Sequence, residues 1–501
     1  MAVIELGPWK PDLPSLGNTC LIARNVIRGQ MGYRQFRSFA NTITALSERI
    51  QGAIAVKETG GGAHIYVGTS TTLQQLPPGA TAFTNRSGTT YNCAADETWS
   101  LATDTASVFA ANIADPIQAS TVGSSSNFAD LAAAAPKCRR LGIWGVHLVA
   151  ANLLDGTTFY PHAVQWCGQT AGVGDPTSWP TPGSVTAGQQ RSDRRFLDGG
   201  AVTGIISGEF GGYVIAEKKI FRSTTDAGSL FFDIQPVEIN RGSRFPGSIA
   251  AVGRILFYLG DDGMWMFDGL QSIPIGAQKI DRWLLADLDA IYIPRICSAI
   301  DPVNKLYILA YPGSGHSSGN PNRLLIFNFS PGVMEWSYVD LTGADLDYLF
   351  PALSLGYTLD SLDDLGFTLD TLPFSLDSYV WQGGVPYLGA VDSSHRAGAF
   401  TGSAMAARLT TGHFQHIQGR RALTTSVGPL VEGASATVTV TPLTKARLAA
   451  AMTTGTASTM NAAGECPMMA SGRYHGYQVD ITGGFDECVG VDPTFEDDGA
   501  Y

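Results

Sequence analysis

Residues 256–267 read LFYLGDDGMWMF: a short apolar run, the turn Asp-Asp-Gly, and a second apolar run that contains an aromatic residue. Two such runs joined by a tight polar turn predict a β-hairpin. Each run is apolar enough to be buried on both faces, as the inner strands of layered β-folds are. Because a two-strand unit cannot bury itself, the core must come from repetition of this unit.

The pattern recurs along the chain, and its first runs are anchored at Ile65, Val108, His147, Tyr213, Leu256, Tyr307 and Leu388. Three of the spacings between successive anchors lie near the roughly 40–50 residues of a four-stranded propeller blade. The repeat therefore predicts a mainly-β chain that contains a β-propeller of about six to seven blades. Stacked β-sandwiches also give short strands at regular spacing, so this alternative stays open.

The composition favours the same fold class. Charged residues make up only 15% of the chain, and 58 of the 501 residues are Gly. Few charges and many Gly disfavour long solvated helices and suit short strands joined by tight turns.

The pattern divides the chain into three regions. We expect an N-terminal arm with a short helix at 42–51 (region 1–50), a propeller at 51–400, and a C-terminal β region at 401–501. Two loops are inserted in the propeller, at about 168–200 and 342–378. In the last region we expect strands at 434–441 and 472–481 and a helical turn at 445–452, and the region either closes the ring or forms a small accessory domain.

The charge balance argues against a nucleic-acid-binding protein. The net charge is −12, from 32 basic and 44 acidic residues. Broad neutralisation of phosphates needs Lys and Arg facing the polymer. An acidic wall would instead suit a conduit that DNA slides past without sticking.

The cysteines and the N-terminus indicate a protein made in a reducing cytoplasm. The seven cysteines are odd in number and widely spaced, with no CxxC pair, so we expect neither a disulfide framework nor a zinc site. The first eighteen residues lack the pattern of a signal peptide. We find no apolar run long enough for a membrane span.

We find no catalytic, cofactor-binding or metal-binding motif. HExxH, a nucleophile elbow and the P-loop consensus are all missing from the sequence. The most unusual segment, LGYTLDSLDDLGFTLDTLPFSLDS at 355–378, repeats roughly every ten residues; its carboxylates are Asp360, Asp363, Asp364, Asp370 and Asp377. Carboxylates can hold a hard cation, but the spacing does not match an EF-hand loop. We favour a segment that docks on a neighbour while the Asp residues cap turns.

Three further features have a structural and a functional interpretation. Residues 224–231, TTDAGSLF, resemble the Asp-box turn of sialidase-type propellers, whose role is structural. The basic patches at 137–140 and 191–195 are either solvated surface or contacts to an acidic partner or DNA. Core packing is the default for six tryptophans, with a carbohydrate platform as the other interpretation: Trp144, Trp166, Trp179, Trp265, Trp336 and Trp381.

The stretch GPWKPDLPSLGNTCLIARNVI at 7–27 resembles the start of a family of tail proteins of short-tailed bacteriophages, the packaged-DNA stabilisation or tail nozzle proteins. The sequence departs from the family pattern at Thr19-Cys20, where Pro-Gly is typical, and at Arg28, where Pro is typical. Four later stretches match in the same order: 124–144, 165–181, 355–378 and 473–493. The resemblance thus runs along nearly the whole chain.

The resemblance implies a non-enzymatic propeller subunit, made in the host cytoplasm, that forms a hexameric ring at the tip of the virion tail. Such a ring would bind the portal-adaptor assembly, contact tail fibres or spikes, and gate genomic DNA that passes through an acidic lumen without specific binding. The alternatives are a virion-associated glycan-binding or glycan-degrading propeller, and a cellular propeller scaffold for protein partners.

Overall fold

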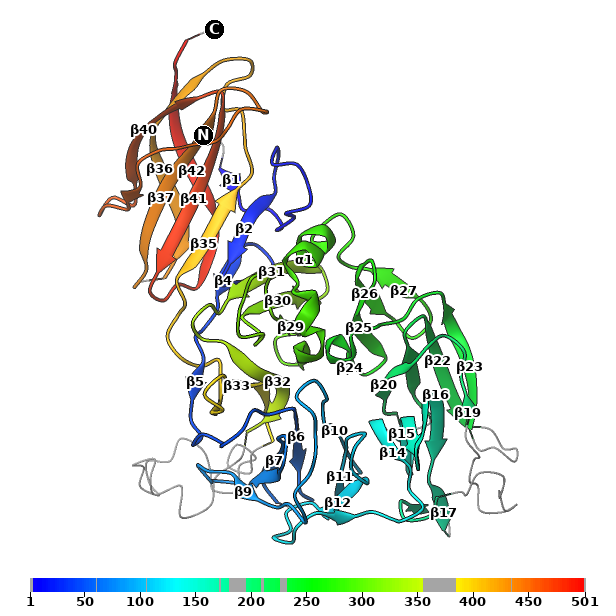
Figure 1. Cartoon of the computed structure of the whole chain (residues 1–501). Helices are drawn as coiled ribbons and strands as arrows, with labels where there is room; N and C mark the ends of the chain where they lie inside the picture. Colours follow the sequence, from blue (N-terminus) through cyan, green and yellow to red (C-terminus); the bar gives the residue numbers. More distant parts are fainter. Residues whose placement is uncertain are drawn as a thin grey trace.

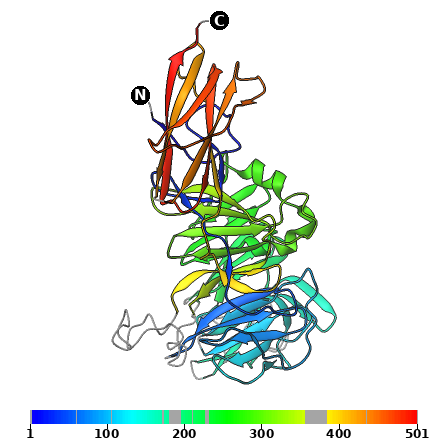
Figure 2. The same ribbon diagram turned by 90° about the vertical axis from the view of Figure 1, so that its left-hand side faces the viewer.

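The computed structural model describes residues 3–59, 61–104, 106–170, 173–179, 195–208, 211–225, 232–354, 384–433 and 435–499. The chain is mainly β, as predicted from its composition. Figure 1 shows two parts: a broad lower body of many small sheets, and an elongated upper part that carries both chain ends. Figure 2 shows from the side that the strands of the upper part run along the length of the molecule. Within the described residues, no helix is long and apolar enough to cross a membrane.

Seven groups of four antiparallel strands form the lower body. The first is β6 (Gly52–Lys57), β7 (Ala63–Gly68), β8 (Leu73–Leu76) and β9 (Thr84–Asn85). The second is β10 (Ser100–Thr103), β11 (Ser107–Ala111), β12 (Gln118–Thr121) and β13 (Ala129–Asp130). The third is β14 (Lys137–Trp144), β15 (His147–Asp155), β16 (Thr158–Trp166) and β19 (Arg195–Phe196), with the small pair β17 (Gly168–Thr170) and β18 (Val173–Asp175) inserted.

The remaining four groups follow the same plan. The fourth is β20 (Val202–Ile206), β21 (Tyr213–Ala216), β22 (Lys219–Thr225) and β23 (Phe232–Ile239). The fifth is β24 (Ala250–Val252), β25 (Ile255–Gly260), β26 (Gly263–Phe267) and β27 (Ser272–Pro274). The sixth is β28 (Cys297–Asp301), β29 (Leu306–Tyr311), β30 (Arg323–Asn328) and β31 (Glu335–Asp340). The seventh is β32 (Leu346–Leu353), β33 (Pro386–Asp392), β34 (Ala397–Ala399) and β5 (Ala40–Asn41).

Every one of the seven sequence anchors lies in the second strand of its group. The hairpin at 256–267 is β25 and β26, which pair in register from Leu256 with Phe267 to Gly260 with Gly263. These second strands are almost wholly buried, as β7 and β29 illustrate. The apolar runs therefore mark the middle of each group, where both faces are covered by neighbouring groups.

The first strands of neighbouring groups contact one another at six of the seven junctions. β6 contacts β10, β10 contacts β14, β14 contacts β20, β24 contacts β28, β28 contacts β32, and β32 returns to β6. The fourth and fifth groups meet where Ile249 packs on Gly204. An apolar cluster fills each junction; that between the seventh and first groups contains Ile65, Val67, Phe350 and Val391.

Strand β5 completes the seventh group although it comes from the N-terminal region. Ala40 pairs with Ala399 and Asn41 with Gly398. The next residues do not form the predicted helix at 42–51. Their backbone N–H groups bond to flanking loops, Thr42 to the Ala397 carbonyl and Leu46 to the His395 carbonyl. The predicted helix does not form because these backbone N–H groups donate to carbonyls of the first and seventh groups of strands. They do not donate to carbonyls one helical turn earlier in the chain.

The upper part is a β-sandwich built from both ends of the chain. One sheet contains β1 (Ile4–Glu5), β3 (Val26–Arg28), β4 (Tyr33–Gln35), β36 (Ala422–Glu432), β40 (Cys466–Gly472) and β42 (Glu487–Asp497). The other contains β2 (Cys20–Arg24), β35 (Ala407–Thr411), β37 (Thr437–Lys445), β38 (Thr453–Thr454), β39 (Ser458–Thr459) and β41 (Tyr474–Thr482). The predicted strands at 434–441 and 472–481 correspond to β37 and β41, whereas 445–452 forms turns rather than a helix.

Asn25 joins the sandwich to the lower body. It has a φ of 61°, in the left-handed region that Asn tolerates better than most residues. Its side-chain amide donates to the Ala406 carbonyl at 2.8 Å and accepts from the Asp340 N–H at 2.9 Å. The adjacent β2 pairs with β31 through Arg24 and Tyr338, so one sheet runs from the sixth group into the sandwich.

The N-terminal residues are packed rather than a free arm. Leu6 and Trp9 are 1% exposed. Asp12 accepts hydrogen bonds from the backbone N–H groups of Arg282 and Trp283, at 2.8 and 2.9 Å, and so caps the short helix α1 (Asp281–Asp287). Two short 3₁₀ helices, η1 (Pro246–Ser248) and η2 (Ala290–Arg295), flank this region.

We predict that Gly398→Ala weakens the closure of the lower body. A Cβ at Gly398 would overlap the Ala40 carbonyl oxygen and force β5 away from β34. We expect a loss of roughly 1–3 kcal/mol, as overpacking in a well-filled site costs, measured as a lower thermal unfolding temperature and faster proteolysis near residue 40. The control is Gly428→Ala in β36, where the nearest atom to a new Cβ is 3.7 Å away. Equal effects of the two variants would contradict the prediction.

Candidate functional site

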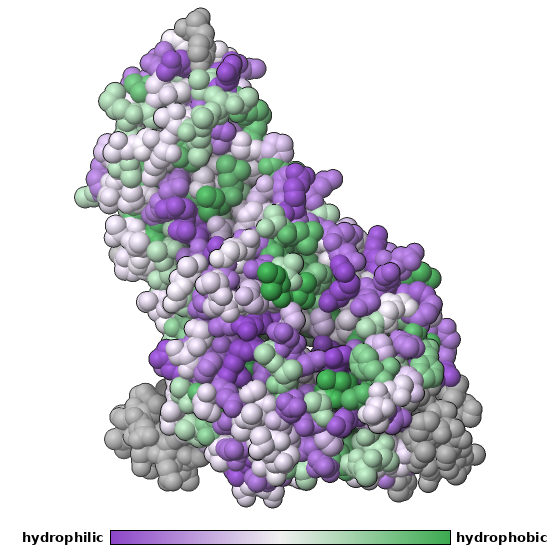
Figure 3. Space-filling model, viewed as in Figure 1, coloured by the Kyte–Doolittle hydropathy of each residue, from purple (hydrophilic) through white to green (hydrophobic). Residues whose placement is uncertain are grey.

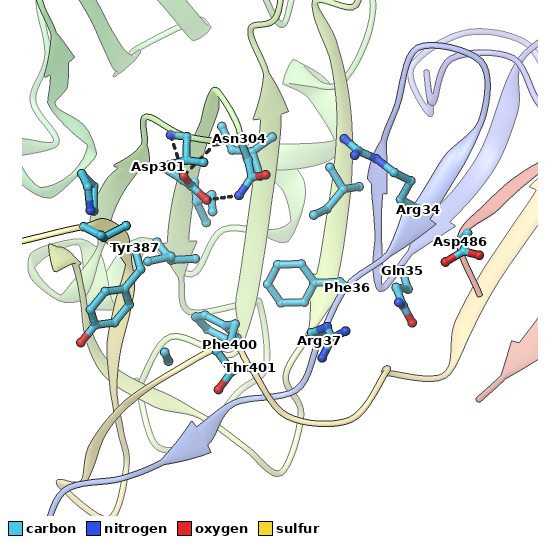
Figure 4. A pocket seen from close by; sticks show the side chains of 18 residues that line it. Arg34, Gln35, Phe36, Arg37, Asp301, Asn304, Tyr387, Phe400, Thr401 and Asp486 are labelled. Atoms are coloured by element: carbon cyan, nitrogen blue, oxygen red, sulfur yellow. Dashed lines mark hydrogen bonds between the residues drawn. The ribbon is translucent and has the colours of Figure 1, made fainter. Parts of the chain in front are cut away.

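A cleft of about 620 Å³ lies where the sandwich meets the sixth and seventh groups. Four separate stretches line it: residues 34–37 in and after β4, 301–308 around the β28–β29 turn, 385–388 in β33, and 399–401 after β34. Figure 4 shows Phe36 and Phe400 side by side in this cleft, with Arg34, Arg37 and Asp486 around them.

The cleft has an apolar floor and a charged rim. The Phe36 and Phe400 rings pack with centroids 5.2 Å apart. Arg34, Arg37 and Asp486 are exposed. Asp301 is already satisfied, because its carboxylate accepts from the Val303 N–H at 3.0 Å and from the Asn304 side chain at 2.7 Å. This arrangement suits contact with another polypeptide better than chemistry.

A second, smaller cavity of about 220 Å³, which we call the axial cavity, lies among the first strands of several groups. It is lined by the first strands of five groups, for example by Ala53, Ser100, Arg140, Thr203 and Tyr348, and by residues of η1. Its volume is below the roughly 300–1,000 Å³ of small-molecule sites.

The basic patch at 137–140 lies between the second and third groups, and its three basic side chains are half-buried. Lys137 donates to the Ala114 carbonyl, and Arg139 Nε lies 3.0 Å from both carboxylate oxygens of Glu97. Arg140 points into the axial cavity. Of the second patch only Arg195 is described, and residues 191–194 lie outside the described residues.

The tryptophans that the structure describes are core residues. Trp144, Trp166 and Trp336 are 0% exposed, Trp179 is 3% and Trp265 is 7% exposed. These five cannot serve as platforms for sugars. Trp381 lies outside the described residues, as do the Leu-Asp repeat at 355–378, most of both inserted loops, and residues 226–231 of the Asp-box-like turn.

The seven cysteines are buried and unpaired. Burial raises the pKa of the Cys20 thiol to about 11 and that of Cys297 to about 12, which makes both poor nucleophiles at neutral pH. In the part of the chain that the structure describes, no three His, Cys, Asp or Glu side chains are placed to hold a metal ion.

A cluster of histidines in the sandwich was not expected from the sequence. His416 Nε2 hydrogen-bonds the Tyr477 hydroxyl at 2.7 Å, and its ring stacks on Phe495 with centroids 4.5 Å apart. His475 is 0% exposed and hydrogen-bonds the Thr424 hydroxyl at 3.2 Å and the Gly472 carbonyl at 2.9 Å. No short motif marks this cluster, because its members come from three strands and a loop.

An exposed apolar area lies over α1 and η2. Leu285 is 39% exposed and Ile291 is 79% exposed. Figure 3 shows hydrophobic side chains at the surface in the region of α1. Exposed apolar side chains that cluster on a surface are typical of contacts with other chains.

No family model and no curated protein matches this chain. Several solved structures align with it weakly. A chain of the mitotic checkpoint complex aligns with a TM-score of 0.38 and 8% identity, over 74% of this chain and 96% of that chain. The computationally designed Ika8 protein aligns with a TM-score of 0.37 and 8% identity, over 71% and 97%. A functionally unknown protein from Desulfotomaculum acetoxidans aligns with a TM-score of 0.35 and 10% identity, over 63% and 98%. At these TM-scores the alignments carry no argument about fold or function.

We predict that the sandwich loses stability in mild acid. Burial, together with the neighbouring His475, lowers the pKa of His416 to about 4, and burial lowers the pKa of His475. Since an unfolded histidine has a pKa near 6.5, the unfolded chain binds more protons than the folded one as pH falls from about 6.5 to about 4. The unfolding temperature should therefore drop over this range.

The variant His416→Phe keeps a ring against Phe495 and removes one titrating group, so its unfolding temperature should depend less steeply on pH. Tyr477→Phe removes the same hydrogen bond but keeps the histidine, and it should retain the slope. The same slope in His416→Phe as in the unmodified protein would contradict the assignment. Both slopes are measured by thermal unfolding between pH 4 and 7.5.

Proposed function

We propose that this chain is a structural subunit of the tail nozzle of a short-tailed bacteriophage. The observation that carries the viral part is the ordered resemblance to the nozzle family from residue 7 to residue 493. Two residues of that resemblance occupy positions on which the two parts of the molecule depend. Asp12 caps α1, and Asn25 joins the sandwich to the lower body.

We propose further that the seven groups are the blades of a β-propeller. The contacts of first strands at six junctions, with Ile249 against Gly204 at the seventh, support this arrangement. So does the completion of the last group by β5, because a strand from the other end of the chain holds the ring shut. On this proposal the first strand of each group lies at the axis and the fourth at the rim.

In this proposal DNA passes through a lumen formed by several chains, since the axial cavity of one chain is only about 220 Å³. A hexameric ring at the tail tip would supply such a lumen. The tail adaptor and the tail fibres or spikes are the expected partners, and DNA would pass without specific binding. We further propose that the acidic balance of the chain, −12 in total, is concentrated on this lumen.

The proposed role is architectural, with no chemistry of its own. The main alternative, a glycan-active propeller, was motivated by tryptophans that could act as sugar platforms. The five described tryptophans are buried, so they do not support a role as sugar platforms. The apolar area over α1 and η2 and the cleft beside the sandwich are surfaces suited to contacts between chains.

The test is immunogold electron microscopy of lysates from the source culture, with an antibody against this chain. We predict gold at the tip of short-tailed particles. The control is the same lysate treated with an antibody that has been pre-absorbed with the purified protein. Unlabelled particles in a lysate that contains the protein would overturn the viral role.

A further inference from the structure

The axial cavity is unusual because its lining contains one charge. Arg140 is the single charged residue among the described residues that line it. The others are apolar side chains, glycines, and the hydroxyl-bearing residues Thr98, Ser100, Thr203 and Tyr348. Arg140 is half-buried. A cation withdrawn from water in this way needs a partner, because an uncompensated charge is costly there.

The described residues do not supply an anionic partner. Arg140 Nη1 donates to the Thr98 hydroxyl at 3.1 Å and to the Arg139 carbonyl at 3.1 Å. Its Nε is buried and has no hydrogen-bond partner among the described residues. Glu97 acts on Arg140 at a distance, but its carboxylate is paired with Arg139, whose Nε lies 3.0 Å from both oxygens. No carboxylate of the described chain lies within ion-pair distance of Arg140.

The cavity holds further donors beside the guanidinium. The Ser100 hydroxyl accepts from the Leu141 N–H at 2.9 Å and so keeps its own proton to donate. Burial raises the pKa of the Tyr348 phenol, although Arg140 acts against this, so the phenol stays protonated at neutral pH. Thr203 is turned away, since its hydroxyl donates to the Ile215 carbonyl at 3.2 Å.

We propose that the axial cavity binds a small oxyanion such as inorganic phosphate, held by Arg140 with the hydroxyls of Ser100 and Tyr348. A guanidinium presents paired N–H donors that match the oxygens of such an anion. The absence of a carboxylate from the described lining makes a cation a poor fit. The volume of about 220 Å³ admits inorganic phosphate but is small for a nucleotide.

Such an anion would connect the seventh group with the second and third groups, which are neighbours of each other but not of the seventh. Ser100 comes from β10 in the second group, Arg140 from β14 in the third, and Tyr348 from β32 in the seventh. One ligand would thus tie opposite sides of the lower body together across its axis. This inference depends on the cavity alone and does not rest on the proposed viral role.

The test measures thermal unfolding of the full chain and isothermal titration calorimetry, with sodium phosphate compared with sodium chloride at equal ionic strength. We expect phosphate to raise the unfolding temperature with saturation, because a ligand that binds only the folded state stabilises it. Arg140→Gln should weaken phosphate binding at least tenfold, and Tyr348→Phe should weaken it severalfold. The control Arg254→Gln changes an exposed arginine in the β24–β25 turn and should leave binding unchanged.

Arg140→Lys keeps the charge but loses the paired donors. It should fold even if Arg140→Gln does not, and it should bind phosphate more weakly than the unmodified protein. A phosphate effect no larger than that of chloride would overturn the proposal. So would an equal response of the unmodified protein and both the Arg140→Lys and Tyr348→Phe variants. A parallel titration with a thymidine oligonucleotide separates the sources of phosphate: stabilisation by the oligonucleotide alone would also overturn binding of a free oxyanion.

Discussion

The lower body depends on the contact between its first and last groups of strands. Sheets with an apolar face are stable only when that face is covered, and each of the seven groups is covered by its two neighbours. The series would leave two open faces if the seventh group did not meet the first. The cluster around Ile65 and Phe350 fills this junction, and β5 pairs with β34 beside it. Because β5 lies ahead of the first group in the chain, its pairing links the beginning of the lower body to its end.

The sandwich depends on a different link between distant segments. Its two sheets combine strands from the first forty residues with strands from the last hundred, so neither end can form it alone. Asn25 sits at the point where β2 passes into β3, and its left-handed backbone and amide hydrogen bonds hold that point against the end of β31. The cleft beside Phe36 follows from this arrangement, since its walls come from both parts of the molecule. A position that connects two parts in this way is a natural place for mechanical coupling between them.

Few charged side chains lie in the interior of this acidic chain. Several half-buried basic side chains of the described residues are paired with carboxylates, as Arg139 is with Glu97 and His395 is with Asp347. Arg140 departs from that rule, and it does so in a cavity lined by the first strands of five groups. The histidines of the sandwich depart from it differently, because their burial keeps them neutral. We therefore expect a ligand to change the stability of the folded state most at Arg140. We expect a proton to change it most at the histidines of the sandwich.

The sequence by itself determined the β class, the seven repeated apolar runs, and the strands near 437 and 474, because these signals are local: alternation, apolar runs and turn residues act within a few positions of each other. It also indicated that the tryptophans belong to the core. Only the tertiary structure decided that β5 completes the seventh group, because a two-residue strand leaves no local signal in the sequence. Only the tertiary structure decided that 42–51 is not helical, because its backbone N–H groups donate to carbonyls that are distant in the sequence. The same reason explains why Arg140 was taken for part of a surface patch. Its surroundings are set by Ser100 and Tyr348, which only the packing of the second, third and seventh groups brings to one cavity.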